Sequence, residues 1–331
     1  MSNRPTTLVL TQADIARSLS IKECIAAVET AFVLGAQDKM AVPQVAHLPA
    51  VKGAFHVKSA AYRLEPHYVA VKVNGNFPTN PRLRGLPTIQ GAILLSDGRD
   101  GRLLAIMDSI EVTALRTGAA TAVAARQLAH GKPHIACIIG CGVQGRIQLR
   151  SILEVFDLDR IYAADENPEQ ARHFADEMRH ETDREVIAVD HFEDVTRESQ
   201  IIITCTPARR AFVEPQHVSP GTFVAAVGAD DSTKQEIAPE LMARAKVVVD
   251  SLDQCAQMGD LRHAIAAGAM RRDDVAAELG DLVAGLVGVD VSGGHVMVFD
   301  STGVAIEDVA AAGVIYERAS AEGLGQAVVL N

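Results

Sequence analysis

Three glycines in the middle of the chain have the spacing of a phosphate-binding turn. An apolar run over 134–139 leads directly into Gly140-Cys141-Gly142-Val143-Gln144-Gly145, and an amphipathic stretch predicts a helix over 146–156. Such glycines permit a tight turn and a close approach of the backbone, and the N–H groups of the following helix attract an anion. The pattern predicts a dinucleotide pyrophosphate at this turn. The alternative is a structural α/β turn without a nucleotide.

An acid follows the next predicted strand. The strand over 160–164 leads into Asp165. A carboxylate at this place accepts hydrogen bonds from the adenosine ribose and repels a 2′-phosphate, so the sequence favours NAD over NADP as the cofactor.

Asp230 follows an apolar strand predicted over 222–227, at the end where α/β sheets bind their ligands. A partly desolvated carboxylate beside a substrate can exchange protons near neutral pH. The alternative is that Asp230, or Asp231 next to it, caps the start of a helix.

Two cations also lie where they could meet an anion. Lys72 belongs to the predicted strand 68–73, on the same face as Ala70, and is either an edge-strand charge or a cation that points into a cleft. Arg116 lies in the first turn of a helix predicted over 113–130, where it opposes the helix dipole and requires a nearby anion. Its alternative is an exposed surface arginine.

Composition excludes several classes of protein. The chain has 331 residues, of which 48% are hydrophobic and 22% charged, and a net charge of −11 argues against nucleic acid or an anionic membrane as the main partner. The five cysteines have no C-x-x-C spacing, and the histidines form no ligand cluster, so we expect no metal. With no secretory signal and no membrane-spanning run, the expected location is the cytoplasm.

The elements that position these residues fall into three stretches. Residues 8–36 read as helical, and short strands follow over 53–61, 68–73, 88–96 and 103–107. The turn sequences Asn74-Gly75-Asn76 and Asp97–Gly101 separate the strands, and the second of them predicts a hairpin. From residue 133 to about 291 strands and helices alternate, with strands near 138, 161, 186, 201–205, 222–227 and 247–250. A strand over 296–299 and a helix from 304 to about 321 complete the chain.

Several longer motifs resemble the ornithine cyclodeaminase/mu-crystallin family. They are Lys72–Pro78, Gly85–Ile89, Met107-Asp108, Thr113–Thr121, Gly140–Gly145, Val227–Asp230 with Lys234, and Val298–Gly303, in family order. The resemblance implies an α/β fold, with a Rossmann-type doubly wound parallel sheet and a discontinuous α+β domain for dimerisation and substrate binding. The implied boundaries are 1–125 with 300–331 for the substrate domain and 126–299 for the NAD-binding domain.

The resemblance also implies roles for individual residues. Asp230 would be the general acid/base, and Lys72 and Arg116 would bind the substrate carboxylate. Cofactor contacts would come from the glycine turn, which is Gly140, Cys141, Gly142, Val143, Gln144 and Gly145. Further contacts would come from Thr88, Thr117, Asp165, Thr206, Val227, Lys234 and Ser301.

One departure from the family pattern affects the substrate pocket. Many members have arginine at the position of Gln44, which follows Pro43, and an apolar residue at the position of Lys58. On a strand, His56 and Lys58 share a face. We therefore expect Lys58, with Gln44 and His56, to shape substrate binding, with Lys58 restoring the missing charge; the alternative is that Lys58 points into solvent.

The implied chemistry is hydride transfer between nicotinamide and the α-carbon of a small amino acid or its imine. Ammonia loss with ring closure would make the protein a cyclodeaminase, and otherwise it would be an amino-acid dehydrogenase or imine reductase. A mu-crystallin-like nucleotide- and ligand-binding protein is the alternative from another class. The implied partners are a small amino or imino acid and a second copy of the chain.

Overall fold

The computed structural model describes residues 6–330, which form two compact units. The discontinuous unit contains the chain up to Arg116 and the segment from Val304 onward, and the internal unit is Thr117–Gly303. The helix α4 (Ser109–Leu128) contributes to both. The family resemblance implied a first boundary at residue 125, which lies in the same helix.

The discontinuous unit is built on a seven-stranded sheet with the order β17-β1-β6-β5-β4-β3-β2. Only the β1–β6 pair is parallel. The strands are β1 (Thr7–Leu10), β2 (Gln44–Ala50), β3 (Gly53–Ala61), β4 (Tyr68–Asn76), β5 (Ile89–Asp97), β6 (Leu103–Asp108) and β17 (Gln326–Val328). The helices besides α4 are α1 (Gln12–Ser18), α2 (Ile21–Ala36), α3 (Asn80–Arg84) and α12 (Ala305–Glu322).

The first predicted helix is divided in the structure. Residues 7–10 form β1, which pairs with β6 and β17, and Leu19 is extended between α1 and α2. Thr11 and Ser20 each form a capping box that starts a new helix. The short apolar strand was indistinguishable from the helical pattern that follows it.

Two further expectations about the strands were wrong. Asn74-Gly75-Asn76 does not turn but continues β4, because both neighbouring strands pair with it along these residues. The edge strand β2 was not predicted. The hairpin between β5 and β6 is confirmed.

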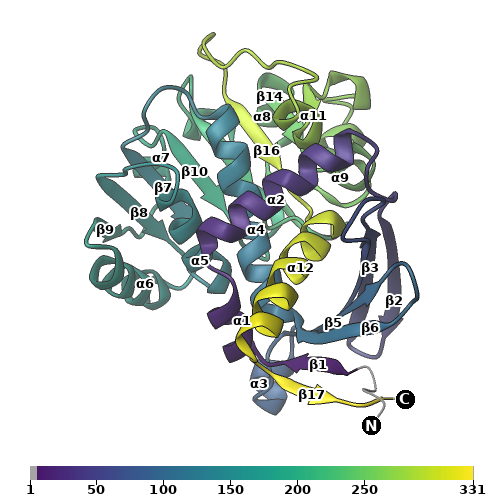
Figure 1. Cartoon of the computed structure of the whole chain (residues 1–331). Coiled ribbons are helices and arrows are strands. Elements are labelled where there is room, and N and C mark those ends of the chain that lie inside the picture. The colour runs from purple at the N-terminus through teal and green to yellow at the C-terminus, as the bar shows by residue number, and fades with distance from the viewer. Residues whose placement is uncertain (1–5, 331) are drawn as a thin grey trace. The chain divides into compact units, whose positions relative to one another are not determined.

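The two faces of this sheet differ. Helix α12 lies along one face, in contact with β3, β4 and β5, and α2 packs against α12 (Figure 1). Strand register places Lys58, Lys72 and Ile93 on that face. The opposite face carries apolar side chains that remain partly or largely exposed, namely Leu48, Phe55, Val57, Val71, Val73 and Leu94. We call this set the open face.

The internal unit contains an eight-stranded parallel sheet with the order β15-β14-β16-β12-β10-β7-β8-β9. Its strands are β7 (Ile135–Ile139), β8 (Arg160–Ala164), β9 (Glu185–Ala188), β10 (Ile201–Thr204), β12 (Phe223–Ala226), β14 (Lys246–Val249), β15 (Ala277–Glu278) and β16 (Met297–Asp300). A separate pair is formed by β11 (Arg209–Val213) and β13 (Gln235–Ile237). The helices are α5 (Val143–Leu153), α6 (Pro168–Thr182), α7 (Glu193–Thr196), α8 (Pro239–Arg244), α9 (Leu252–Met258), α10 (Asp260–Ala266) and α11 (Leu279–Val283), with 3-10 turns at Pro215–His217 and Arg272–Asp274.

Strand order confirms the predicted Rossmann-type fold class. The chain runs outward from β7 through β8 to β9, then returns to the other side of β7 with β10 and β12 (Figure 1). The direction of winding thus reverses between β7 and β10, and such a reversal is where doubly wound sheets bind their ligands. The strands of the sheet core are buried and near-continuously apolar. Among the described residues, no helix is long and apolar enough to span a membrane.

Candidate functional site

Three cations and two carboxylates meet on the α12 face of the discontinuous unit. Lys58 and Lys72 are directly opposite each other on β3 and β4. The Lys72 Nζ is 2.8 Å from Asp308 Oδ1, which also lies 3.0 Å from Arg116 Nε. Arg116 additionally donates to Glu307 Oε2 at 2.6 Å. All five are buried, and we call them the cationic cluster.

The cationic cluster makes Lys72 easy to deprotonate. Burial and the nearby positive charges of Arg116 and Lys58 lower the pKa of Lys72 to about 7, against the opposing effect of Asp308. The edge-strand alternative for Lys72 is excluded, since the residue is 3% exposed and β4 is an interior strand of its sheet; its contact with a substrate stays a prediction.

Arg116 is also buried, which excludes the exposed alternative, but its place in the helix differs from the predicted one. Because α4 begins at Ser109, Arg116 lies two turns inside the helix and not in its first turn. Its anionic partners are Glu307 and Asp308, from the first turn of α12. The expected anion is therefore present, and it comes from the far end of the sequence.

The two acids of α12 were missed by the sequence analysis. Glu307 and Asp308 are adjacent charges in a helix whose neighbouring residues are alanine, valine and isoleucine. A pair of acids on an otherwise apolar stretch is the signal that could have found them, since buried acids require partners.

Lys58 is buried, which excludes the solvent-facing alternative. His56 shares its face and stacks edge-on against His47, with 4.7 Å between ring centroids. Gln44 is different. It is exposed, it lies opposite Ser59 on the other face of the sheet, and its side chain bonds the carbonyls of Val42 and Pro43. Register thus does not bring Gln44 together with Lys58, and the expectation that Lys58 restores the missing charge stays a prediction.

The glycine turn of the internal unit has the geometry of a pyrophosphate site. Gly140 has a φ of +105°, which favours glycine, and Gly145 packs so closely that a Cβ would lie 2.2 Å from the Gly140 carbonyl oxygen. Gly142 is the N-cap of α5, and a Cβ there would meet no atom within 4 Å. The backbone at the start of α5, where Val143 is exposed and Gln144 half-buried, is therefore open to a ligand. These residues fit the phosphates of NAD.

Asp165 lies beside this turn at the end of β8, as predicted. One carboxylate oxygen accepts the backbone N–H of Cys141 at 2.8 Å, and the other accepts that of Asn167 at 2.9 Å. The side chain is thereby held at the edge where the adenosine ribose of a bound dinucleotide would lie.

Asp165→Ser is expected to relax the preference for NAD over NADP. Removing the carboxylate removes its repulsion of a 2′-phosphate, so the ratio of Kd for NADPH to Kd for NADH should fall about tenfold or more. NADH and NADPH fluorescence titrations measure the two constants, with Glu166→Ser as the control. An unchanged ratio would show that the ribose lies elsewhere.

Asp230 follows β12 and forms an ion pair with Lys234, 2.5 Å between Lys234 Nζ and Asp230 Oδ1. The side chain of Asp230 is 48% exposed and that of Lys234 19%. Burial alone would lower the pKa of Lys234, but Asp230, together with the charges of Asp231 and Glu236, more than offsets it, and the net shift is upward. The helix-cap alternative for Asp230 was wrong, because a turn and then β13 follow it.

The other predicted cofactor residues lie in both units. Val227 and Ser301 follow β12 and β16, and the Ser301 hydroxyl donates to Asp250 at 3.2 Å. Thr206 follows β10, and Thr117 is buried in α4. Thr88 belongs to the discontinuous unit and precedes β5, where its carbonyl accepts the N–H of Phe77. Their contacts with the cofactor remain predictions.

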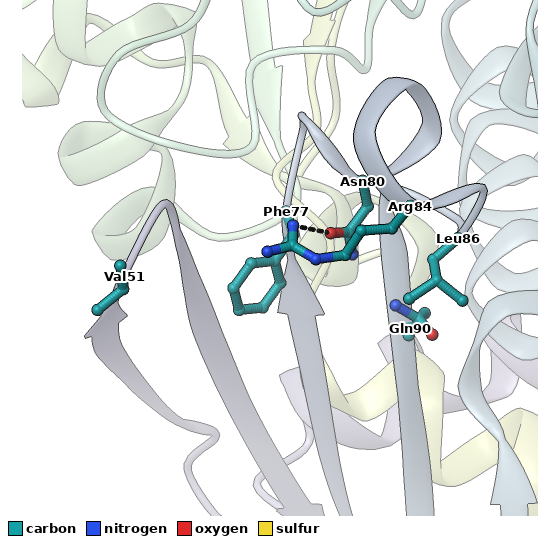
Figure 2. Close-up of a pocket in the computed structure, with 6 residues that line it drawn as sticks. All are labelled: Val51, Phe77, Asn80, Arg84, Leu86 and Gln90. Atoms are coloured by element: carbon teal, nitrogen blue, oxygen red, sulfur yellow. Dashed lines mark hydrogen bonds between the residues drawn. The ribbon is translucent and has the colours of Figure 1, made fainter.

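A surface pocket of about 250 Å³ lies at the end of the seven-stranded sheet, and none of the residues that line it is a predicted site residue. Figure 2 shows the Arg84 guanidinium bonded to Asn80 in this pocket, at 3.1 Å. The lining residues are Val51, Phe77, Asn80, Arg84, Leu86 and Gln90. None of the five residues of the cationic cluster lines this pocket. Lys72 lies four residues before the end of β4 at Asn76, and Phe77 of the pocket lies beyond that end. The described residues contain no group of three or more potential metal ligands.

Comparisons with known proteins agree with this geometry. The model of the ornithine cyclodeaminase/mu-crystallin family matches residues 5–323. Alanine dehydrogenase of Archaeoglobus fulgidus is 36% identical, over 97% of this chain and 98% of that protein.

Two solved structures are similar over nearly the whole chain. An archaeal alanine dehydrogenase dimer with bound NAD has a TM-score of 0.94 at 34% identity, covering 99% of this chain and 100% of that one. The Δ1-pyrroline-2-carboxylate reductase of Thermococcus litoralis, in complex with NADH and L-proline, has a TM-score of 0.94 at 33% identity, covering 97% and 100%. The expected NAD-dependent enzyme is confirmed, and the chain belongs to the ornithine cyclodeaminase/mu-crystallin family.

Proposed function

We propose that this NAD-dependent enzyme is an amino-acid dehydrogenase or imine reductase that acts at the α-carbon of a small amino acid. The observation that carries the proposal is the cationic cluster. Lys58, Lys72 and Arg116 gather there in one buried cluster, with Lys72 and Arg116 in ion pairs with Asp308 and Glu307. Such a concentration of cations attracts a substrate carboxylate, and Arg116 offers it a planar guanidinium.

The chemistry balances as follows. Oxidised NAD, when bound, would supply the acceptor for a hydride from the substrate α-carbon. The resulting imine takes up water and releases ammonia, which leaves a 2-oxo acid, or the reverse sequence reduces an imine to an amino acid. We assign Asp230 the proton transfer at the nitrogen or the attacking water, because it follows a central strand at the carboxyl edge.

A cyclodeaminase is the second candidate, and Lys58 argues against it. That reaction needs a substrate with a second amine, which carries a positive charge at neutral pH. Lys58 is buried directly opposite Lys72, so it adds positive charge beside the cation that we assign to the carboxylate. A monoamino acid or a cyclic imine avoids this repulsion.

The test is turnover of a substrate panel followed by mass spectrometry and NADH absorbance. The panel contains L-alanine, L-proline, Δ1-pyrroline-2-carboxylate, L-ornithine and L-lysine. We expect a stoichiometric NADH change with a monoamino acid or a cyclic imine. Ring closure of ornithine with ammonia release and no net NADH would establish the cyclodeaminase instead. Coenzyme binding without any turnover would favour a binding protein.

Lys58→Met is expected to raise the KM for the preferred carboxylate substrate about tenfold or more. The substitution keeps a long unbranched side chain, one atom shorter, but removes a buried charge of the cluster. Lys22→Met, at an exposed position on α2, is the matched control. An unchanged KM in Lys58→Met would remove Lys58 from the substrate site.

We further propose that the protein is a homodimer in the cytoplasm. The open face presents six apolar side chains to solvent, and covering such a surface by a second copy is favourable. The solved archaeal relative is described as a dimer. The five cysteines are free thiols, which suits a reducing compartment.

Val71→Lys is expected to convert the dimer into a monomer, because it places a charge in the middle of the open face. The molar mass measured by light scattering after gel filtration should then fall from about twice to about once the 35.2 kDa mass of the chain. Leu286→Lys, on an exposed residue of the internal unit, should leave the mass unchanged. A dimer that survives Val71→Lys would place the interface elsewhere.

A further inference from the structure

Glu236 is a fully buried carboxylate that joins two segments at the carboxyl edge of the parallel sheet. Its Oε1 accepts both the backbone N–H and the hydroxyl of Thr206, each at 2.7 Å. Its Oε2 accepts the backbone N–H of Gly228 and the hydroxyl of Thr204, also at 2.7 Å each. Thr204 is the last residue of β10, Thr206 follows that strand, and Gly228 follows β12. One side chain therefore holds the ends of two adjacent strands together.

The position of Glu236 is itself fixed by its surroundings. A Cβ on Gly228 would lie 2.5 Å from the carboxylate carbon, so the absence of a side chain there leaves the space that Glu236 occupies. On β13, the backbone N–H groups of Glu236 and Ile237 both donate to Asp260 Oδ1 at 2.9 Å. Burial raises the pKa of Glu236, and the donors from Thr206, Thr204 and Gly228 oppose that effect.

The two segments lie where half of a bound dinucleotide must pass. The glycine turn follows β7, and Asp165, at the end of β8, marks the adenosine side. Strands β10 and β12 lie on the other side of β7. A dinucleotide that crosses the carboxyl edge with its pyrophosphate at the turn therefore extends its nicotinamide half over the ends of β10 and β12.

We propose that Glu236 is a positioning residue for the nicotinamide half of NAD, because it sets the separation between the Thr206 segment and the Gly228 segment. The inference rests on NAD as the cofactor, but not on which substrate is turned over. Glu236 itself touches no reacting atom. Its effect passes through the two backbone segments, and through Gly228 to the loop that leads to Asp230.

The test compares coenzyme binding with binding of its adenosine half. In Glu236→Gln the amide keeps one acceptor oxygen. Its NH2 group replaces the other oxygen and faces an N–H and a hydroxyl that formerly donated hydrogen bonds to that oxygen. We expect the Kd for NADH to rise about tenfold or more, and the Kd for ADP, which needs only the glycine turn and Asp165, to stay within about twofold. Equal losses for NADH and ADP, or no loss for either, would overturn the proposal.

Thr204 gives a second test that leaves Glu236 in place. Thr204→Val removes one hydroxyl donor at a fully buried position, whereas Thr204→Ser keeps it. We expect weaker NADH binding in Thr204→Val and recovery in Thr204→Ser, and equal Kd values in the two variants would contradict the role. Glu240→Gln, at an exposed position on α8, is the control. All of these titrations use NADH or ADP without turnover, so a wild-type protein that binds NADH but oxidises no amino acid would overturn only the proposed reaction.

Discussion

Asp230→Asn is expected to lower kcat about 10²- to 10⁴-fold while the Kd for NADH stays within about threefold. Asparagine has nearly the same shape but cannot take up a proton from the amine or the attacking water. The ion pair with Lys234 holds the wild-type carboxylate in place, and 48% exposure leaves its side chain accessible. A loss confined to kcat would identify Asp230 as the proton-transfer group.

The neighbouring Asp231 provides the control. Its carboxylate accepts the backbone N–H and the hydroxyl of Thr233, both at 2.7 Å, and so stabilises the turn that follows Asp230. We expect Asp231→Asn to retain kcat within about threefold. If Asp231→Asn lost as much as Asp230→Asn, the shape of the loop rather than proton transfer would explain both results.

Lys72→Met is expected to lower kcat/KM about thirtyfold to several thousandfold. Truncating one partner of a buried, hydrogen-bonded charge pair costs about 2 to 5 kcal/mol. Here the substitution removes a cation assigned to the substrate carboxylate and also leaves Asp308 without its 2.8 Å contact. Most of the loss should appear in KM, since the carboxylate is bound in both the ground state and the transition state.

The same residue predicts a pH dependence. The pKa of Lys72 is lowered to about 7 by burial first and by Arg116 next, so the side chain is charged below pH 7 and largely neutral above it. The KM for an anionic substrate should therefore rise as the pH increases through this range. Asp308 raises the pKa of Lys72, and Asp308→Asn should move the rise to lower pH. Steady-state kinetics from pH 5.5 to 9 measure the shift, and a KM that is independent of pH would contradict it.

The sequence predicted best the strands of the parallel sheet and the residues that directly follow them. Strand β8 has the expected bounds, and the glycine turn, Asp165 and Asp230 lie at the ends of the strands that were expected to carry them. The periodic apolar runs of a parallel sheet and its glycines are local signals, and local signals are what a single sequence contains. The short strand β1 was not predicted, because three apolar residues directly before a helix are indistinguishable from the helical pattern.

The cationic cluster shows where local reasoning ends. The depth of Arg116 depended on the helix start at Ser109, where the Asp108 carboxylate accepts the backbone N–H groups of Ile110 and Glu111 at 2.9 and 3.3 Å, a capping signal that the sequence analysis missed. The pairing of Lys72 with Asp308 joins residues 236 positions apart, and no periodicity in either segment connects them. Glu236 is likewise a single acid in a short strand, and only the fold brings Thr204, Thr206 and Gly228 to its carboxylate.

Transfer of deuterium from the α-carbon of an amino acid to NAD tests the central claim most directly. The enzyme is incubated with NAD and amino acids deuterated at the α-carbon, with L-alanine and L-proline first. Mass spectrometry then measures the masses of the reduced coenzyme and of the organic products. We predict NADH that carries one deuterium, with an equal amount of 2-oxo acid and ammonia from alanine, or of cyclic imine from proline. Bound NAD that remains unlabelled, with every amino acid of the panel recovered unchanged, would contradict hydride transfer at the α-carbon.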